Sequence, residues 1–252
     1  MTVEPTWHLA LALVLLMALA VVVSRVGRLG QERDIVVAGL RAVIQLAVVS
    51  TIIVAALQNL ALAALFVALM FVVAVRTTVQ RTGVGRAWPW TALAMATGIV
   101  PVLAIIFGSG TVPPNALSLI PIAGIVVGNM MTAHTLFGRR QFAALRDGVG
   151  IFEAALALGF ARAAAIRLVS EGTAREALVP NLDQTRTVGL VTLPGAFIGV
   201  LLGGGSALQA GAAQVLVLVA IMAGQTIVVV VANWLMCQGK LLPPDLVDML
   251  HP

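Results

Sequence analysis

Charged side chains are scarce in this sequence of 252 residues. They make up 10% of it, against about 25% in an average soluble domain, while 60% of the residues are hydrophobic. Tyrosine is absent, and lysine and cysteine occur once each, as Lys240 and Cys237. The single cysteine excludes an intrachain disulfide framework and a cysteine-rich metal site. No soluble fold of this size could bury so much apolar surface, so the sequence predicts an all-α polytopic membrane protein.

Apolar stretches of membrane-spanning length recur along the chain. A transmembrane helix needs about 20 predominantly apolar residues. Seven stretches are interpreted as spans: 7–23, 35–57, 60–75, 88–107, 116–136, 187–202 and 212–235. The first stretch has no basic region before it, so we expect a retained span and not a cleaved signal. The sequence therefore predicts one membrane domain over residues 1–252, with seven transmembrane helices.

The basic residues fall in alternate loops between these spans. The loops that carry them follow spans one, three, five and seven, and the opposite loops contain no Lys or Arg; the residues are Arg25, Arg28, Arg33, Arg76, Arg81, Arg86, Arg139, Arg140, Arg146, Arg162, Arg167, Arg175, Arg186 and Lys240. An excess of Lys and Arg marks the cytoplasmic side. We therefore expect the N-terminus outside, the C-terminus inside the cell, and a multi-pass protein of the bacterial inner membrane.

Missing motifs exclude several classes of membrane protein. No acidic residue lies within a predicted span, which disfavours a carrier coupled to protons or sodium. The ATP-binding P-loop pattern is absent, so the chain does not hydrolyse ATP itself. Lys240 follows the last span, which argues against a retinal pigment with a Schiff-base lysine. Metalloprotease and nucleophile-elbow patterns are absent as well, so we expect neither an enzyme nor a bound cofactor.

The one long segment with charge throughout is 139–186, a basic, helix-forming insert between the fifth and sixth spans. We interpret it as a cytoplasmic coupling segment that docks on a soluble partner. A second helical piece is expected from Glu153 to about Leu168. Within it, residues 153–159 read EAALALG, similar to the EAA-x-x-x-G motif of many ABC-transporter permeases. An amphipathic helix lying on the membrane face is the plainer alternative.

That motif suits a docking helix chemically. Ala154 and Ala155 allow close approach, Gly159 permits a sharp turn after the helix, and Glu153 offers a carboxylate to a partner arginine or helix N-terminus. The longer form of the motif, with a following Ile-x-Leu-Pro, is not matched, because Pro180 lies further along.

Three further segments carry a resemblance to a known family. They are RAVIQL at 41–46, PIAGIVVGNMM at 121–131 and VGLVTLPG at 188–195. With 153–159 they make the chain similar to the FetB-type (UPF0014) permease family from about residue 41 to 233. That family includes iron-export and metal-resistance ABC permeases and plant relatives linked to aluminium tolerance. The resemblance implies a separate FetA-type ATP-binding subunit, a homodimer of this chain, and export of iron or another metal.

One basic and one amide side chain stand out in the second span. Arg41 is the only ionisable group well inside a predicted span, and Gln45 follows one turn later on the same face. Buried charge is costly in a membrane, so Arg41 is a candidate for the translocation path. The favoured alternative is a snorkelling arginine near the cytoplasmic interface.

Polar residues in the fifth and seventh spans form a second set of path candidates. Asn129 can line a path or hold helices together, and interhelical bonding is the commoner role. Met130 and His134 share a face, and thioether and imidazole suit Cu(I) or Fe(II), although Met is also common filler and His134 can be interfacial. Gln225 and Asn233 share a face of the seventh span, with path lining and helix bonding equally supported.

Pro194 and Gly195 are expected to bend the sixth span, because proline removes a backbone hydrogen bond. Such bends often act as hinges in transporters, and a static kink is the alternative. The preferred reading is thus an ABC permease subunit with no nucleic-acid partner. A stand-alone secondary carrier or channel is the second hypothesis, and a membrane-embedded enzyme or receptor is the third.

Overall fold

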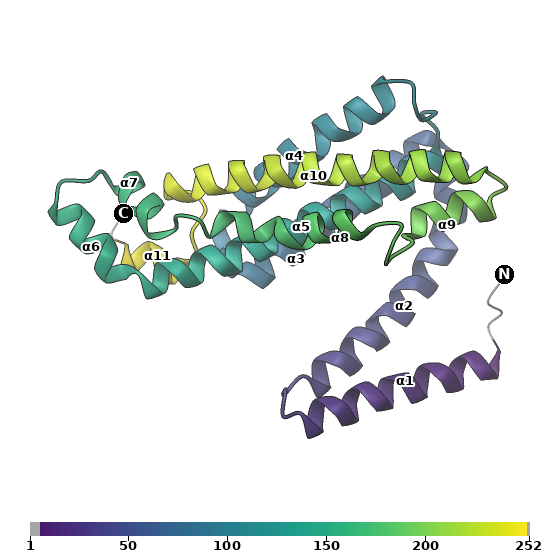
Figure 1. Ribbon diagram of the computed structural model, residues 1–252, viewed down its shortest axis with the longest axis horizontal. Helices are drawn as coiled ribbons and strands as arrows, with labels where there is room; N and C mark the ends of the chain where they lie inside the picture. Colours follow the sequence, from purple (N-terminus) through teal and green to yellow (C-terminus); the bar gives the residue numbers. More distant parts are fainter. Residues whose placement is uncertain (1–5, 251–252) are drawn as a thin grey trace. The chain divides into compact units, whose positions relative to one another are not determined.

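A computed structural model describes residues 6–250, and every regular element in that range is a helix (Figure 1). One isolated bridge, between Val188 and Thr192, is the only strand-like pairing within it. The chain divides into two compact units, the first ending at Asn59 and the second beginning at Leu60. The all-helical class is confirmed, while the expectation of a single membrane domain stays a prediction.

The first unit is a hairpin of two apolar helices, α1 (Trp7–Val26) and α2 (Glu32–Ala56). Arg28 turns the chain between them with a φ of 54°, and the Ser24 hydroxyl donates a hydrogen bond of 3.2 Å to the Glu32 carboxylate. Both helices are long and apolar enough to cross a membrane. Their largely exposed surfaces suit helices that lipid surrounds, which agrees with the first two predicted spans.

The second unit is built on four long helices: α3 (Leu60–Thr82), α4 (Trp88–Gly108), α5 (Ala116–Asp147) and α10 (Ala207–Cys237). A short 3-10 turn, η1 (Gly85–Ala87), precedes α4. All four qualify as membrane spans by length and hydropathy. The 32 residues of α5 extend about 48 Å, well beyond a hydrocarbon core of about 30 Å, so this helix continues past the predicted limit at residue 136.

Small residues let these helices approach closely. A Cβ on Gly98 of α4 would lie 2.7 Å from the Gly224 carbonyl oxygen of α10, and a Cβ on Gly138 of α5 would lie 2.7 Å from the Thr82 methyl of α3. Close approach at small residues is typical of helix packing in membranes, where van der Waals contact and hydrogen bonds hold helices together in place of the hydrophobic effect.

Helices α5 and α10 run in the same direction. Ser118 and Gln209, near their starts, line one cavity, and Phe142 and Met236, near their ends, belong to one core cluster. The chain must therefore return between them, from the Asp147 end of the second unit, where α5 and α10 finish, to the Asn115 end, where they begin. Figure 1 shows this return along the bundle, made by α8 (Val179–Thr187), an irregular stretch, and α9 (Gly195–Leu202).

The sixth predicted span is wrong as a continuous helix. Residues 188–194 are not helical, and α9 has only eight residues. Six helices among the described residues, not seven, are long and apolar enough to cross a membrane. The window 187–202 was apolar enough for a span, but Gly189 adopts a φ of 80° and Pro194 lacks an N–H group. These two residues divide the segment.

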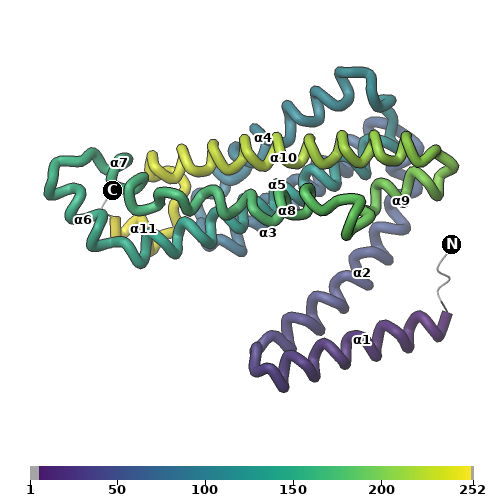
Figure 2. Tube along the Cα trace, viewed as in Figure 1, coloured from purple at the N-terminus to yellow at the C-terminus, as the bar shows by residue number. Residues whose placement is uncertain are grey.

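The remaining elements gather at the Asp147 end, as the trace in Figure 2 shows. They are α6 (Val149–Ala157), α7 (Arg162–Val169), η2 (Ala174–Ala177) and α11 (Pro244–Met249). Their apolar side chains share a core with α5 and α10 that includes Phe142, Phe152, Ile166, Leu235 and Leu246. The predicted insert 139–186 is thus a folded extension of the bundle.

Candidate functional site

Helices α6 and α7 form a short hairpin that begins directly after α5. Gly148 joins α5 to α6, and a Cβ there would lie 2.4 Å from the Val169 side chain of α7, so only glycine lets α7 fold back this closely. Phe152 and Ala155 of α6 are buried, as are Ala165 and Ile166 of α7. The hairpin therefore has its own small core continuous with that of the bundle.

Gly159 ends α6 in a Schellman motif. Its φ is 88°, its N–H donates to the Leu156 carbonyl at 2.9 Å, and the Phe160 N–H donates to the Ala155 carbonyl at 3.0 Å. This pair of bonds satisfies two carbonyls at the helix end. The sharp turn expected at Gly159 is confirmed, but the single helical piece from Glu153 to about Leu168 is wrong, because this turn separates α6 from α7.

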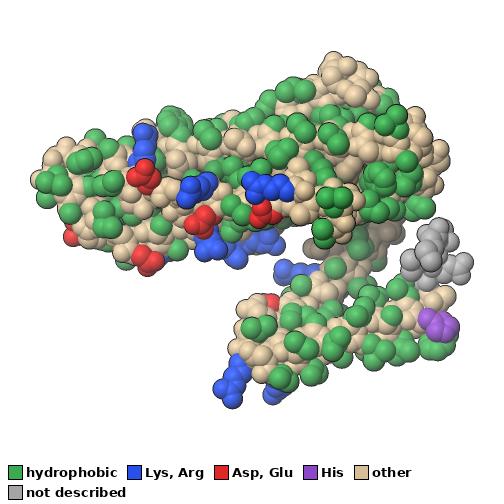
Figure 3. Space-filling model, viewed as in Figure 1, with side chains coloured by type: hydrophobic (Ala, Val, Ile, Leu, Met, Phe, Trp, Pro, Cys, Tyr) green, Lys and Arg blue, Asp and Glu red, His purple; other side chains and the backbone are tan. Residues whose placement is uncertain are grey.

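The outer face of the hairpin is exposed and largely apolar. Leu158 is 79% exposed, Ile151 58% and Phe160 48%. Glu153, Ala154 and Gly159 are also exposed, and Glu153 has no ion pair among the described residues. Ala155 is buried, so of the four predicted coupling residues it serves the hairpin core. Figure 3 shows hydrophobic side chains over this end of the second unit.

Two predicted path residues meet at the middle of the bundle. The Gln225 side-chain N–H of α10 donates to the backbone carbonyl of Asn129 in α5 at 3.2 Å. The Asn129 side chain in turn donates to the Ile125 carbonyl of its own helix at 2.9 Å. The Gln225 side-chain oxygen is buried without a hydrogen-bond partner. This junction joins α5 to α10 and leaves one buried acceptor free.

Met130 and His134 lie deep in the second unit. Met130 is fully buried against Gly224, where an added Cβ would lie 2.9 Å from its sulfur. His134 is fully buried, and neither ring nitrogen has a hydrogen-bond partner. Gln141, seven residues later on the same face, is buried with both amide atoms unpartnered. Residues 6–250 contain no group of three His, Cys, Asp or Glu side chains placed to hold a metal ion.

The other predicted path residues are more dispersed. Asn233 is half-buried on α10, two turns beyond Gln225. Arg41 and Gln45 lie on α2 of the first unit, where both side chains are exposed. Their part in a path stays a prediction.

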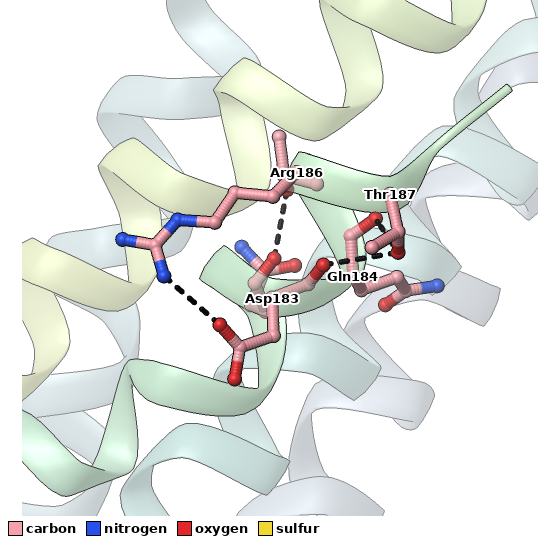
Figure 4. Close-up of polar contacts among 6 residues, drawn as sticks. Asp183, Gln184, Arg186 and Thr187 are labelled. Atoms are coloured by element: carbon pink, nitrogen blue, oxygen red, sulfur yellow. Dashed lines mark hydrogen bonds and ion pairs between the residues drawn. The ribbon is translucent and has the colours of Figure 1, made fainter. Parts of the chain in front are cut away.

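The broken return segment carries residues that the sequence interpretation passed over. Near the end of α8, Arg186 forms an ion pair of 3.0 Å with Asp183, and the Thr187 hydroxyl donates to the Asp183 carbonyl at 3.1 Å (Figure 4). Beyond it, Leu190 is 90% exposed although it is apolar. Pro194 begins α9 as its N-cap residue, so it does not bend a helix as predicted. The sequence did indicate that this segment is more polar than a simple span, because charged residues continue up to Arg186, directly before the predicted sixth span.

The depth of this ion pair along the bundle follows from a second pair. Arg140 of α5 lies 3.3 Å from Glu176 of η2, so η2 packs at the level of residue 140. The nine residues of α8 then rise about 13 Å toward the Asn115 end. Figure 3 shows Lys or Arg and Asp or Glu side chains next to one another along one face of the second unit. This face is therefore polar well beyond the Asp147 end.

A cavity opens at the Asn115 end between α5, α9 and α10. It has a volume of about 840 Å³ and an apolar lining that includes Leu117, Pro121, Ile125, Gly199 and Leu216, with Ser118 and Gln209 among its few polar groups. Helix α9 lines this cavity, and α8 carries an ion pair of the polar face. Both features therefore involve the return segment.

Comparison with known proteins gives one family. The model of an uncharacterised protein family, UPF0014, matches residues 6–240. UPF0014 membrane protein YjkA of Bacillus subtilis is 28% identical over 90% of this chain and 92% of its own. UPF0014 membrane protein STAR2 of Oryza sativa subsp. japonica is 32% identical over 86% and 78%. The probable iron export permease protein FetB of Escherichia coli is 28% identical over 90% and 88%. No solved structure matches the chain.

Proposed function

The chain belongs to the UPF0014 family of membrane proteins, and we propose that it is the permease subunit of an ABC transporter that exports iron or another metal or metal complex. The observation that carries the proposal is the α6–α7 hairpin, whose exposed apolar tip follows a glycine-terminated helix. The similarity to FetB of Escherichia coli, a probable iron export permease, supports the transport class and the cargo.

The proposed topology has seven crossings, the sixth made by α8, residues 188–194 and α9. Three observations support it: α5 and α10 run parallel, the return segment lies along them (Figure 1), and Arg81, Arg86 and Lys240 lie at the Asp147 end. The turns at the Asn115 end, 109–115 and 203–206, contain no Lys or Arg. By the positive-inside rule the Asp147 end faces the cytoplasm, with the N-terminus outside.

In the proposed coupling step, Ile151, Leu158 and Phe160 insert into a groove on a separate ATP-binding subunit, and Glu153 meets a basic group there. The buried core of the hairpin, with Phe152 against Ile166 in one cluster, transmits movement of that subunit to α5. A homodimer of this chain with two ATP-binding subunits completes the transporter. Such a transporter would work in the bacterial inner membrane.

The proposed path runs along the polar face that carries the ion pairs of α5, η2 and α8. Irregular backbone at membrane depth is tolerated only where protein buries it or water lines it. Residues 188–194 and the Asp183–Arg186 pair therefore favour a water-lined path, or one covered by the second copy. Asn129 and Gln225 contribute the interior polar groups, and Pro194 and Gly195 serve as the hinge between α8 and α9.

The test is metal efflux in reconstituted vesicles with and without a candidate ATP-binding subunit. We expect ATP-dependent movement of Fe²⁺ that Leu158→Asp abolishes together with co-purification of the subunit. Met249→Asp, an exposed apolar position on α11 at the same end, is the matched control and should retain both. Transport without any ATP-binding subunit would instead establish a stand-alone carrier.

Orientation has its own test. In a Cys237→Ala background, Leu158→Cys should react with a membrane-impermeant thiol reagent only in inside-out vesicles, and Thr111→Cys only in intact cells. The opposite pattern would contradict the proposed topology.

A further inference from the structure

A groove at the Asp147 end lies between the start of α4 and the residues that follow α10. Its volume is about 610 Å³, and its lining includes Arg86, Ala87, Trp90, Lys240, Val247 and Asp248. It is distinct from the exposed apolar face of the α6–α7 hairpin: none of the hairpin residues 149–169 lines it, although the Arg162 side chain of α7 lies beside Gly239 at its edge.

The fold holds Lys240 over this groove. Gly239, with a φ of 72°, ends α10 in a Schellman motif in which the Lys240 N–H donates to the Leu235 carbonyl at 3.0 Å. The ammonium group of Lys240 then lies 4.8 Å from the ring centre of Trp90 and 5.7 Å from that of Trp234. Both distances are within the range of cation–π attraction, so the only lysine of the chain has a defined position.

The positive charges of the groove have no acidic partner. Arg86 and Lys240 form no ion pair within residues 6–250, and Asp248, the acidic residue of the lining, pairs with neither of them. The first turn of α4 contains no acidic residue, and no side chain caps it, so its partial positive charge also faces this region. The guanidinium of Arg162 lies beside Gly239, 3.5 Å from where a Cβ would be.

The groove lies at the level of the membrane–water boundary. Arg86 is the last charge before α4, and Lys240 is the first charge after α10; the apolar spans lie between these residues and the far end. Trp88 is 58% exposed and Trp234 52%. Exposed tryptophans and basic residues at the ends of apolar helices are typical of this boundary.

A second groove, suited to an acyl chain, adjoins the first. It runs between α3 and α4, has a volume of about 340 Å³, and is lined by Phe71, Val72, Val75, Val79 and Trp88, with Arg76 as its charged residue. Gly85 lines both grooves. A charged groove that continues into an apolar one matches a molecule with an anionic head and a hydrocarbon tail.

We propose that these two grooves form a binding site for an anionic phospholipid, with the phosphate near Arg86 and Lys240 and an acyl chain along α3 and α4. Basic pockets between transmembrane helices are known to bind anionic lipid headgroups, because their positive charges attract the phosphate. A soluble phosphate would not need the apolar groove, and an acidic protein segment would not need the tryptophans at the boundary.

Native mass spectrometry of the intact protein released from nanodiscs tests the proposal. With equal phosphatidylglycerol and phosphatidylcholine, we expect retained lipid to be phosphatidylglycerol. In the double variant Arg86→Gln, Lys240→Gln, the ratio of retained phosphatidylglycerol to phosphatidylcholine should fall about 30-fold, the change expected when two basic residues near an anionic membrane surface are removed. Arg175→Gln, an exposed arginine of η2 outside the groove, is the matched control and should keep it.

Further variants and a competition experiment distinguish a lipid from free phosphate, and loss of binding from loss of folding. Val72→Trp, at an exposed position of the apolar groove, should reduce phosphatidylglycerol retention, and Lys240→Arg should preserve it. Equal retention of both lipids by the wild type, or an unchanged preference in the double variant, would overturn the proposal. Displacement of the lipid by millimolar inorganic phosphate would also overturn it.

Discussion

The side-chain amide of Gln225 donates a 3.2 Å hydrogen bond to the backbone carbonyl of Asn129 and so ties α10 to α5 at mid-bundle. The carbonyl of Asn129 lies within a helix, where it already accepts the regular intrahelical bond. The extra bond therefore serves the contact between helices. The Gln225 side-chain oxygen is buried without a partner, so a water or a solute would reach it only if α5 and α10 moved apart.

Replacing Gln225 separates these two roles. We expect Gln225→Leu to lower the free energy of unfolding by about 0.6 kcal/mol, the average for such a bond in a membrane, and to reduce the proposed metal flux. Thermal unfolding and vesicle flux measure the two effects. Thr226→Val, which removes only a bond to its own helix at Met222, is the control, and flux unchanged in Gln225→Leu would leave only the bonding role.

The turn at Gly159 gives a second prediction. Gly159→Ala places a Cβ at a φ of 88°, which costs about 1–2 kcal/mol in the left-handed region, so the tip of the hairpin should change shape. If the proposed coupling role holds, ATP hydrolysis by a candidate ATP-binding subunit should lose its stimulation by this chain. Gly150→Ala, in open space on helical backbone, should retain it; equal loss in both variants would contradict this reading.

The close approach of α4 and α10 gives a third. A Cβ on Gly98 would meet the Gly224 carbonyl at 2.7 Å and a Val228 methyl at 2.4 Å, and a backbone atom cannot move aside locally. We expect Gly98→Ala to destabilise the protein by about 1–3 kcal/mol, the usual cost of overpacking. Gly128→Ala, where nothing lies within 4 Å, should be neutral in the same thermal assay. A neutral Gly98→Ala would show that the helices can separate.

The ion pair between Arg146 and Asp245 gives a pH dependence. The hydrogen bond from Arg146, at 2.7 Å, lowers the pKa of the Asp245 carboxyl. Because the folded pKa is depressed, the pair contributes stability above the unfolded pKa of about 3.9, and this contribution is lost as pH falls through the folded pKa.

Both partners of that pair are substantially exposed, so the contribution should be about 0–1 kcal/mol. We expect Asp245→Asn to lower the melting temperature slightly at pH 7 and to match the wild type once pH falls below the folded pKa. Asp248→Asn, which removes no ion pair, is the control. A difference that grew on acidification would refute this account.

Hydropathy alone located α1 to α5 and α10, because each contains an apolar run of about the length of a span. It failed for 187–202, because Gly189 and Pro194 interrupt the helix there, and mean hydropathy does not depend on backbone conformation. The end of α5 was also missed, since helix propensity and packing under η2 extend it beyond the apolar region. Turn chemistry was the more reliable guide at Gly159, where the expected sharp turn is confirmed, although the helical piece predicted from Glu153 to about Leu168 is not.

The candidate site was less accessible to prediction. Asn129 and Gln225 were each identified as polar residues in a span, but their contact depends on the register between α5 and α10, which no local pattern records. The burial of Ala155 follows from the way α7 folds onto α6 and could not be seen in the motif itself. The ion pair Asp183–Arg186 belongs to the polar face only because α8 packs along the bundle, and the sequence does not show where α8 packs.

The irregular stretch between α8 and α9 has a mechanical consequence. No backbone hydrogen bond described in this region connects residues 187–192 to residues 194–198, and Pro194 has no N–H to make one. The two half-helices are therefore joined by rotatable bonds alone at this place. A movement at the Asp147 end would therefore reach the Asn115 end through α5 and α10, and α9 would follow α10, against which it packs, and not α8.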